Sequence, residues 1–170
     1  MGTEGTPMLD LLRHQVLPVD MRTLSGTATL ALASRPESVR RARDFTRSTL
    51  HGWRLPEQFD AVALVVSELV TNALRHGVRS VNGSSGEHAG DYEPAPAPTA
   101  VELELMRYSG RLVCAVHDPS ELAPRVGEMD GAAESGRGLH LVECFSDGWG
   151  WRPLTGERPG KVVWAVFRTG

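Results

Sequence analysis

Alternating and helical patterns of apolar residues divide the first third of the chain into one strand and two helices. Residues 27–34, TATLALAS, alternate Thr with Ala or Leu, as expected for a strand with one buried face. Residues 36–50 place apolar side chains at helical spacing, and Pro36-Glu37 behind a serine is typical of a helix start. A second helix is expected over residues 56–76, because Gly77 is a common C-cap residue.

The second half of the chain reads as two pairs of strands around one further helix. Residues 100–107 alternate and residues 111–118 are more continuously apolar, so a short turn between them predicts a hairpin. A helix over residues 138–147 precedes two last strands, residues 148–153 and 161–168. This order predicts an α+β fold: a two-layer α/β sandwich whose mixed, mostly antiparallel sheet has helices packed on one face.

The domain organisation follows from where these patterns stop. Residues 1–24 are expected to form a flexible N-terminal tail, and residues 25–170 a single domain. Residues 79–99 are rich in Gly, Ser and Pro and lack periodicity, so they cannot bury enough apolar surface to offset their ordering entropy. They are predicted to be a mobile insertion within the domain.

Composition narrows the possible functions. The 170 residues are 41% hydrophobic with a net charge of -3, so no basic excess supports direct nucleic-acid binding. No apolar stretch is long enough to span a membrane and no signal peptide is evident, so a cytoplasmic protein is expected. Cys114 and Cys144 lie in apolar contexts without metal-ligand spacing, and both are expected to be buried free thiols.

A narrow polar line crosses the second helix. Glu68 and Asn72 are four residues apart, so they share one helix face, and His76 continues the line between apolar neighbours. A solvated stripe and the floor of a binding pocket are both compatible with this spacing. The narrowness of the line favours the pocket, where a carboxylate can accept a proton and an amide oxygen can bind Mg²⁺.

Two further segments carry candidate chemistry. Asp118 ends an apolar strand in VHDPS, where it is either a turn residue or an acceptor for an exocyclic amine. In ESGRGLHLVE, Ser135, Gly136 and Gly138 precede a helix, which is either an ordinary connection or a loop whose N–H groups approach phosphate. It is not a Walker loop, because GK[ST] is absent and Lys161, the chain's one lysine, lies far away in a terminal strand.

Together these motifs resemble the histidine-kinase-like ATPase superfamily, which has the Bergerat-type ATP-binding fold. ELVTNALRHG is similar to its N-box, VHDPS to its first glycine box and SGRGLHLVECFSD to its second. The closing GKVVWAVF resembles the last strand of the branch that holds the anti-sigma-factor serine/threonine kinases. The resemblance covers about residues 27–168.

The resemblance implies a role for each matched residue. Glu68 would be the catalytic base, Asn72 would bind Mg²⁺, and Asp118 would accept a hydrogen bond from the adenine amino group of ATP. The remaining expected nucleotide-binding residues are His76, Ser135, Gly136, Arg137, Gly138 and Leu139.

Two departures from the family pattern leave the activity open. The first box lacks its usual glycines, and Glu134 stands where some anti-sigma kinases have an arginine; whether Arg137 substitutes is left open. The resemblance implies an ATP- and Mg²⁺-dependent regulator that binds a sigma factor, phosphorylates Ser or Thr of an anti-anti-sigma partner, or does both. The alternatives are a degenerate module that regulates by binding only, and an ATPase without a protein substrate.

Partner contacts are suggested by one surface and by analogy. The outer face of the first helix is either a solvated face or a docking surface for an acidic partner, and it carries Arg40, Arg41, Arg43 and Arg47. By analogy with the branch, a homodimer through the sheet edge is also expected to be possible.

Overall fold

The computed structural model describes residues 21–77, 101–120, 124, 135–155 and 159–169. Their elements, in chain order, are η1 (Met21–Thr23), β1 (Leu24–Leu32), α2 (Glu37–Gly52), η2 (Pro56–Gln58), α3 (Phe59–Asn72), η3 (Ala73–Gly77), β2 (Val101–Tyr108), β3 (Arg111–Asp118), α5 (Ser135–Phe145), β4 (Gly148–Leu154) and β5 (Gly160–Arg168). The predicted tail therefore includes four ordered residues, 21–24, and the predicted insertion at 79–99 lies outside the described residues.

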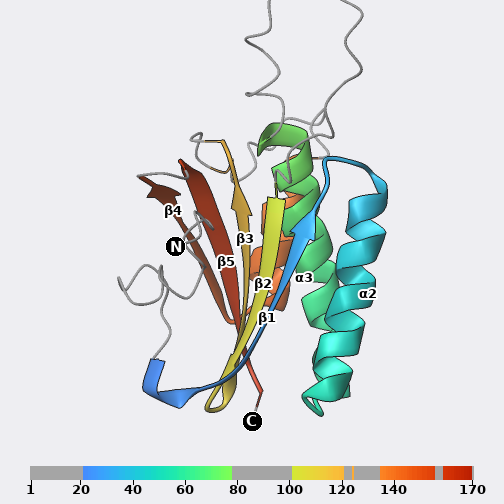
Figure 1. Ribbon diagram of the computed structural model, residues 1–170, viewed down its shortest axis with the longest axis vertical. Helices are drawn as coiled ribbons and strands as arrows, with labels where there is room; N and C mark the ends of the chain where they lie inside the picture. Colours follow the sequence, from blue (N-terminus) through green and yellow to red (C-terminus); the bar gives the residue numbers. More distant parts are fainter. Residues whose placement is uncertain (1–20, 78–100, 121–123, 125–134, 156–158, 170) are drawn as a thin grey trace, which may run out of the picture.

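The described strands form one five-stranded sheet in the order β1-β2-β3-β5-β4. All four neighbouring pairs are antiparallel. The helices cover one face of this sheet, with α2 and α3 lying side by side (Figure 1). The predicted α+β fold with helices on one face is confirmed.

The core lies between the sheet and the helices. Successive strand residues point to opposite faces, and Leu103, Leu105 and Cys114 of the central strands point toward the helices. Val62 and Val66 of α3 pack against them at helical spacing. Each fully buried side chain of this size contributes roughly 1.5–3 kcal/mol, so this layer supplies most of the hydrophobic stabilisation.

The opposite face of the sheet carries a second apolar cluster. It contains Met106, Tyr108, Val113, Ala115, Leu154 and Val162. Glu104 lies on the same face as Met106 and is only 1% exposed. Burial and, to a smaller extent, the nearby negative charge of Glu102 together raise the pKa of Glu104 from 4.5 to about 8.

Three element boundaries differ from the predictions in ways that affect candidate residues. The regular part of the second helix ends at Asn72, and Ala73–Gly77 forms a π-helical turn. A π turn bonds each residue to the fifth along the chain, so the four-residue line from Glu68 to Asn72 does not extend regularly to His76. The last helix starts at Ser135, three residues earlier than expected, and β1 begins at Leu24.

The two cysteines differ from each other. Cys114 is buried in the core, where desolvation raises the pKa of its thiol to about 12. Cys144 is exposed, and its Sγ lies 3.7 Å from Nε2 of His140 one helical turn away. The expectation of two buried thiols was therefore wrong for Cys144, because α5 turns this position away from the sheet.

Candidate functional site

The polar line on α3 occupies the last two turns of this helix. Glu68 and Asn72 are half-buried, whereas Val65, Val66 and Leu69 of the same turns are buried in the core. Within the described part of the chain, neither polar side chain has a hydrogen-bond or ion-pair partner. A carboxylate and a carboxamide in this position are neither sequestered in the core nor tied to neighbours, so they are available to a ligand.

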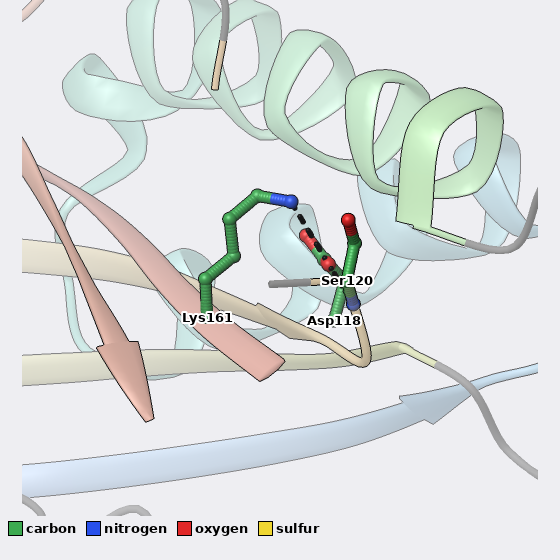
Figure 2. A network of polar contacts seen from close by, with 3 residues as sticks. All are labelled: Asp118, Ser120 and Lys161. Carbon is green, nitrogen blue, oxygen red and sulfur yellow. Dashed lines mark hydrogen bonds and ion pairs between the residues drawn. The ribbon is translucent and has the colours of Figure 1, made fainter. Parts of the chain in front are cut away.

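Asp118 lies at the end of β3, on the helix-facing side of the sheet. It is 1% exposed, and its Oδ1 accepts a hydrogen bond of 2.8 Å from the backbone N–H of Ser120. The same oxygen forms an ion pair of 3.0 Å with Nζ of Lys161 (Figure 2). The sequence motif therefore contains a buried, hydrogen-bonded carboxylate and not a solvated turn residue.

Lys161 is a site residue that sequence reasoning missed. It was expected to lie far from the glycine-bearing segment, in a terminal strand, and it is 43 residues from Asp118 along the chain. The antiparallel pairing of β3 with β5 places Lys161 directly opposite Asp118, so the two side chains share one face at the ends of their strands. The signal available in the sequence was a single lysine at the start of an otherwise apolar last strand.

Gly160 allows the two strand ends to approach each other. Its φ is +148°, a conformation that side-chain-bearing residues rarely adopt, and a Cβ here would lie 2.1 Å from the backbone oxygen of Asp118. Only glycine fits this approach. The strand ends are therefore fixed by backbone packing as well as by the ion pair.

The ends of α3 and β3 lie close together. The π turn η3 that continues α3 contacts β3, and Figure 1 shows η3, the end of β3 and the start of β5 at the same end of the molecule. In the close-up, Asp118, Ser120 and Lys161 lie between the sheet and the α3 helix (Figure 2). The structure thus brings the first two predicted motifs to one end of the sheet.

The third motif forms the first turn of α5. Residues 135–138 belong to this helix, which packs against α3, and the side chain of Leu139 is buried in the core. The expected loop is therefore a helix N-terminus. The first N–H groups of a helix have no acceptor within the helix, so the backbone here keeps the capacity to bind phosphate that the sequence suggested. The nucleotide contacts of Ser135, Gly136, Arg137, Gly138 and His76 stay predictions.

Metal binding would depend on a small number of protein ligands. Among the described residues, no group of three His, Cys, Asp or Glu side chains could hold a metal ion. The amide oxygen of Asn72 is a suitable single ligand for Mg²⁺, which usually keeps several waters and binds through substrate phosphates. The residues present therefore fit a Mg²⁺ ion that is bound mainly by the phosphates of a nucleotide.

None of the helices described has both the length and the apolar character needed to cross a bilayer.

Comparison with known proteins gives one family and one kind of fold. Residues 32–167 match the family described as the histidine kinase-like ATPase domain, and no curated protein matches the chain. A chain in the crystal structure of the SiaB–SiaC complex from Pseudomonas aeruginosa is similar, with a TM-score of 0.53 and 16% identity, covering 94% of this chain and 98% of that chain. At this identity the structural similarity supports the fold alone.

Proposed function

This chain belongs to the histidine kinase-like ATPase domain family, and we propose that it is an ATP-binding regulator of the anti-sigma-factor type. It binds ATP with Mg²⁺ and acts in the cytoplasm on a protein partner, either a sigma factor or an anti-anti-sigma factor. The observation that carries the proposal is that α3, which bears half-buried Glu68 and Asn72, contacts β3, which ends in buried Asp118, both directly and through η3.

The three residues have separate chemical tasks in this proposal. The carboxylate of Asp118 accepts a hydrogen bond from the base, and the amide oxygen of Asn72 binds the Mg²⁺ that accompanies the phosphates. When bound, Mg²⁺ neutralises charge on the phosphate oxygens. Glu68 is half-buried and unpaired within the described residues, so it can approach a hydroxyl group or a water molecule near the γ-phosphate.

Phosphoryl transfer to the partner would then proceed in one step, in which one bond to the γ-phosphorus forms and another breaks. Glu68 takes the proton from a Ser or Thr hydroxyl of the partner while that oxygen forms a bond to the γ-phosphorus. The bond from the γ-phosphorus to its bridging oxygen breaks, and ADP leaves. The phosphate ends on the partner and the proton on Glu68, from which it passes to solvent.

Partner recognition is assigned to the outer face of α2. Arg40, Arg41 and Arg43 are exposed there, whereas the guanidinium of Arg47 also lies 4.7 Å above the ring centre of Phe59. These exposed arginines fit an acidic partner surface. That the similar solved structure is a two-protein complex supports a regulator that acts through another protein.

A binding-only regulator is the second candidate, and one observation favours it. The ammonium of Lys161 already contacts the carboxylate expected to accept a hydrogen bond from adenine, so this carboxylate is engaged before any nucleotide binds. In this reading the fold regulates its partner without phosphoryl transfer.

A phosphorylation assay separates the two candidates. The wild-type chain and Glu68→Gln are incubated with γ-labelled ATP, Mg²⁺ and a panel of anti-anti-sigma proteins. The proposal predicts labelling of at least one protein by the wild type and a loss of about 100-fold or more with Glu68→Gln, within the range usual for a general base. Labelling that survives the substitution would refute the role of Glu68, and nucleotide binding without any labelling would favour the binding-only regulator.

A further inference from the structure

The sheet face that carries the second apolar cluster (the outer face) is buried in its middle and open at its edges. Four apolar side chains of the three inner strands are 0% exposed, namely Met106, Val113, Ala115 and Val162. Directly paired strand residues share a face. Thr27 of β1 pairs with Met106, and Arg152 of β4 pairs with Val162, yet both Thr27 and Arg152 are exposed. The outer face is therefore covered only over β2, β3 and β5.

The burial of the inner strands requires a cover that belongs to this chain. A sheet face that is open to water leaves its side chains partly exposed, whereas these four reach 0% exposure within a single chain. The described helices lie on the other face of the sheet (Figure 1), so the cover comes from residues outside the described ranges. It is also narrow. The three inner strands are roughly 10 Å across, which is about the diameter of one α-helix with its side chains.

Residues 8–17, MLDLLRHQVL, have the sequence expected of such a cover. Six of these ten residues are Met, Leu or Val, whereas the two longer internal segments outside the described ranges, 78–100 and 125–134, contain two such residues each. Helical spacing places four of the apolar residues on one side, namely Met8, Leu11, Leu12 and Val16, and three polar residues on the other, namely Asp10, Arg13 and His14. Pro18 then ends the pattern.

We propose that residues 8–17 form an amphipathic helix that lies across the outer face and covers the second apolar cluster. The chain leaves this segment and enters η1 and then β1, where the first residue, Leu24, packs against the same cluster. Ten helical residues are about 15 Å long, which is enough to cross three strands. Residues 8–17 then belong to the folded domain, unlike the flexible tail expected from the sequence. The outer face is occupied within each chain and is not a site for a second copy.

Photo-crosslinking of the full chain tests the position of this segment. Benzoylphenylalanine replaces Leu12, and the crosslinked peptides are identified by mass spectrometry after irradiation. Crosslinks within one chain to outer-face residues of β2, β3 or β5 are expected. The control carries the same label in place of Val81, in the other long segment outside the described ranges, and is expected to give no crosslink to the outer face.

A matched pair of substitutions tests the burial without a label. Leu12→Asp places a charge on the side of the segment that faces the cluster, so it is expected to lower the Tm by about 5 °C or more. Val81→Asp makes the same chemical change in the control segment and is expected to shift the Tm by less than about 2 °C. Both variants are compared with the wild type in the same buffer and at the same protein concentration.

Four results would overturn the inference. Crosslinks between two chains would make a second copy the occupant of the outer face. Crosslinks to this face from the label at position 81, with none from position 12, would make the internal segment the cover. The absence of any crosslink from position 12 to the outer face would show that residues 8–17 do not lie there. Equal Tm values for the wild type and Leu12→Asp would show that Leu12 is not buried.

Discussion

Buried Glu104 is expected to make the free energy of unfolding strongly dependent on pH. Its side chain is 1% exposed on the sheet face that carries the second apolar cluster, and among the described residues its Oε2 has no hydrogen-bond partner. Desolvation by burial and, to a smaller extent, the charge of Glu102 together raise its pKa from 4.5 to about 8. The folded chain therefore holds a proton on Glu104 at pH values where the unfolded chain has released it.

The size of the effect follows from the two pKa values. One pKa unit corresponds to about 1.4 kcal/mol. Because the folded-state pKa is the higher one, the contribution is fully present below pH 4.5, decreases as the pH rises, and is lost above about pH 8. The total loss attributable to Glu104 is roughly 3–5 kcal/mol, which is a large part of the stability of an ordinary domain.

Urea unfolding followed by tryptophan fluorescence measures this loss directly. The wild type and Glu104→Gln are compared at several pH values from 5 to about 8.5, a range chosen to span the titration. The variant is expected to match the wild type within about 1 kcal/mol at the acidic end and to exceed it by several kcal/mol at the alkaline end, because an amide stays neutral. Glu37→Gln, at an exposed position in the first turn of α2, is the control and should follow the wild type. Parallel pH profiles for the wild type and Glu104→Gln would refute the reasoning.

Three further predictions test the site, its backbone and its partner surface. Glu68→Gln should slow phosphoryl transfer by about 100-fold or more. It should change the dissociation constant for Mg-ATP less than about threefold by calorimetry, since the side chain acts on the hydroxyl and not on the nucleotide; a large loss of affinity would contradict this. Gly160→Ala should lower the free energy of unfolding by about 2–4 kcal/mol in urea titrations, because the added Cβ would lie 2.1 Å from a carbonyl oxygen of β3. The control Gly52→Ala has open space around it and should change the free energy of unfolding by less than about 1 kcal/mol. Equal effects of the two substitutions would refute the close approach at Gly160. Reversing the charges of Arg40 and Arg43 to Glu should weaken partner binding in pull-down assays without altering Mg-ATP affinity; loss of both would indicate misfolding.

Local patterns in the sequence were sufficient to predict most of the fold. The alternation in residues 100–107 and the apolar run in residues 111–118, joined by a short turn, identified a hairpin that the structure forms as β2 and β3. The spacing of Glu68 and Asn72 predicted their shared face within a mostly apolar helix, and both are half-buried at its end. These features depend on contacts between residues near one another along the chain. The spacing of apolar and polar residues in the sequence is therefore enough to predict them.

Features that depend on distant contacts were missed. The pairing of Lys161 with Asp118 arises from the register between β3 and β5, which no local pattern encodes. The burial of Glu104 arises from the second apolar cluster, because alternation alone assigns that side of β2 to solvent. The π turn at Ala73–Gly77 also departs from the regular spacing that placed His76 in line with Asn72.

The central claim is that this chain is a nucleotide-binding protein. Thermal unfolding with and without Mg-ATP is the most direct test of this claim. A ligand at about 100 times its dissociation constant adds roughly 2.7 kcal/mol to the free energy of unfolding, which for a chain of this length raises the Tm by roughly 5–11 °C. The account predicts such a rise, a requirement for Mg²⁺, and its loss in Asn72→Ala. An unchanged Tm at millimolar Mg-ATP would contradict it.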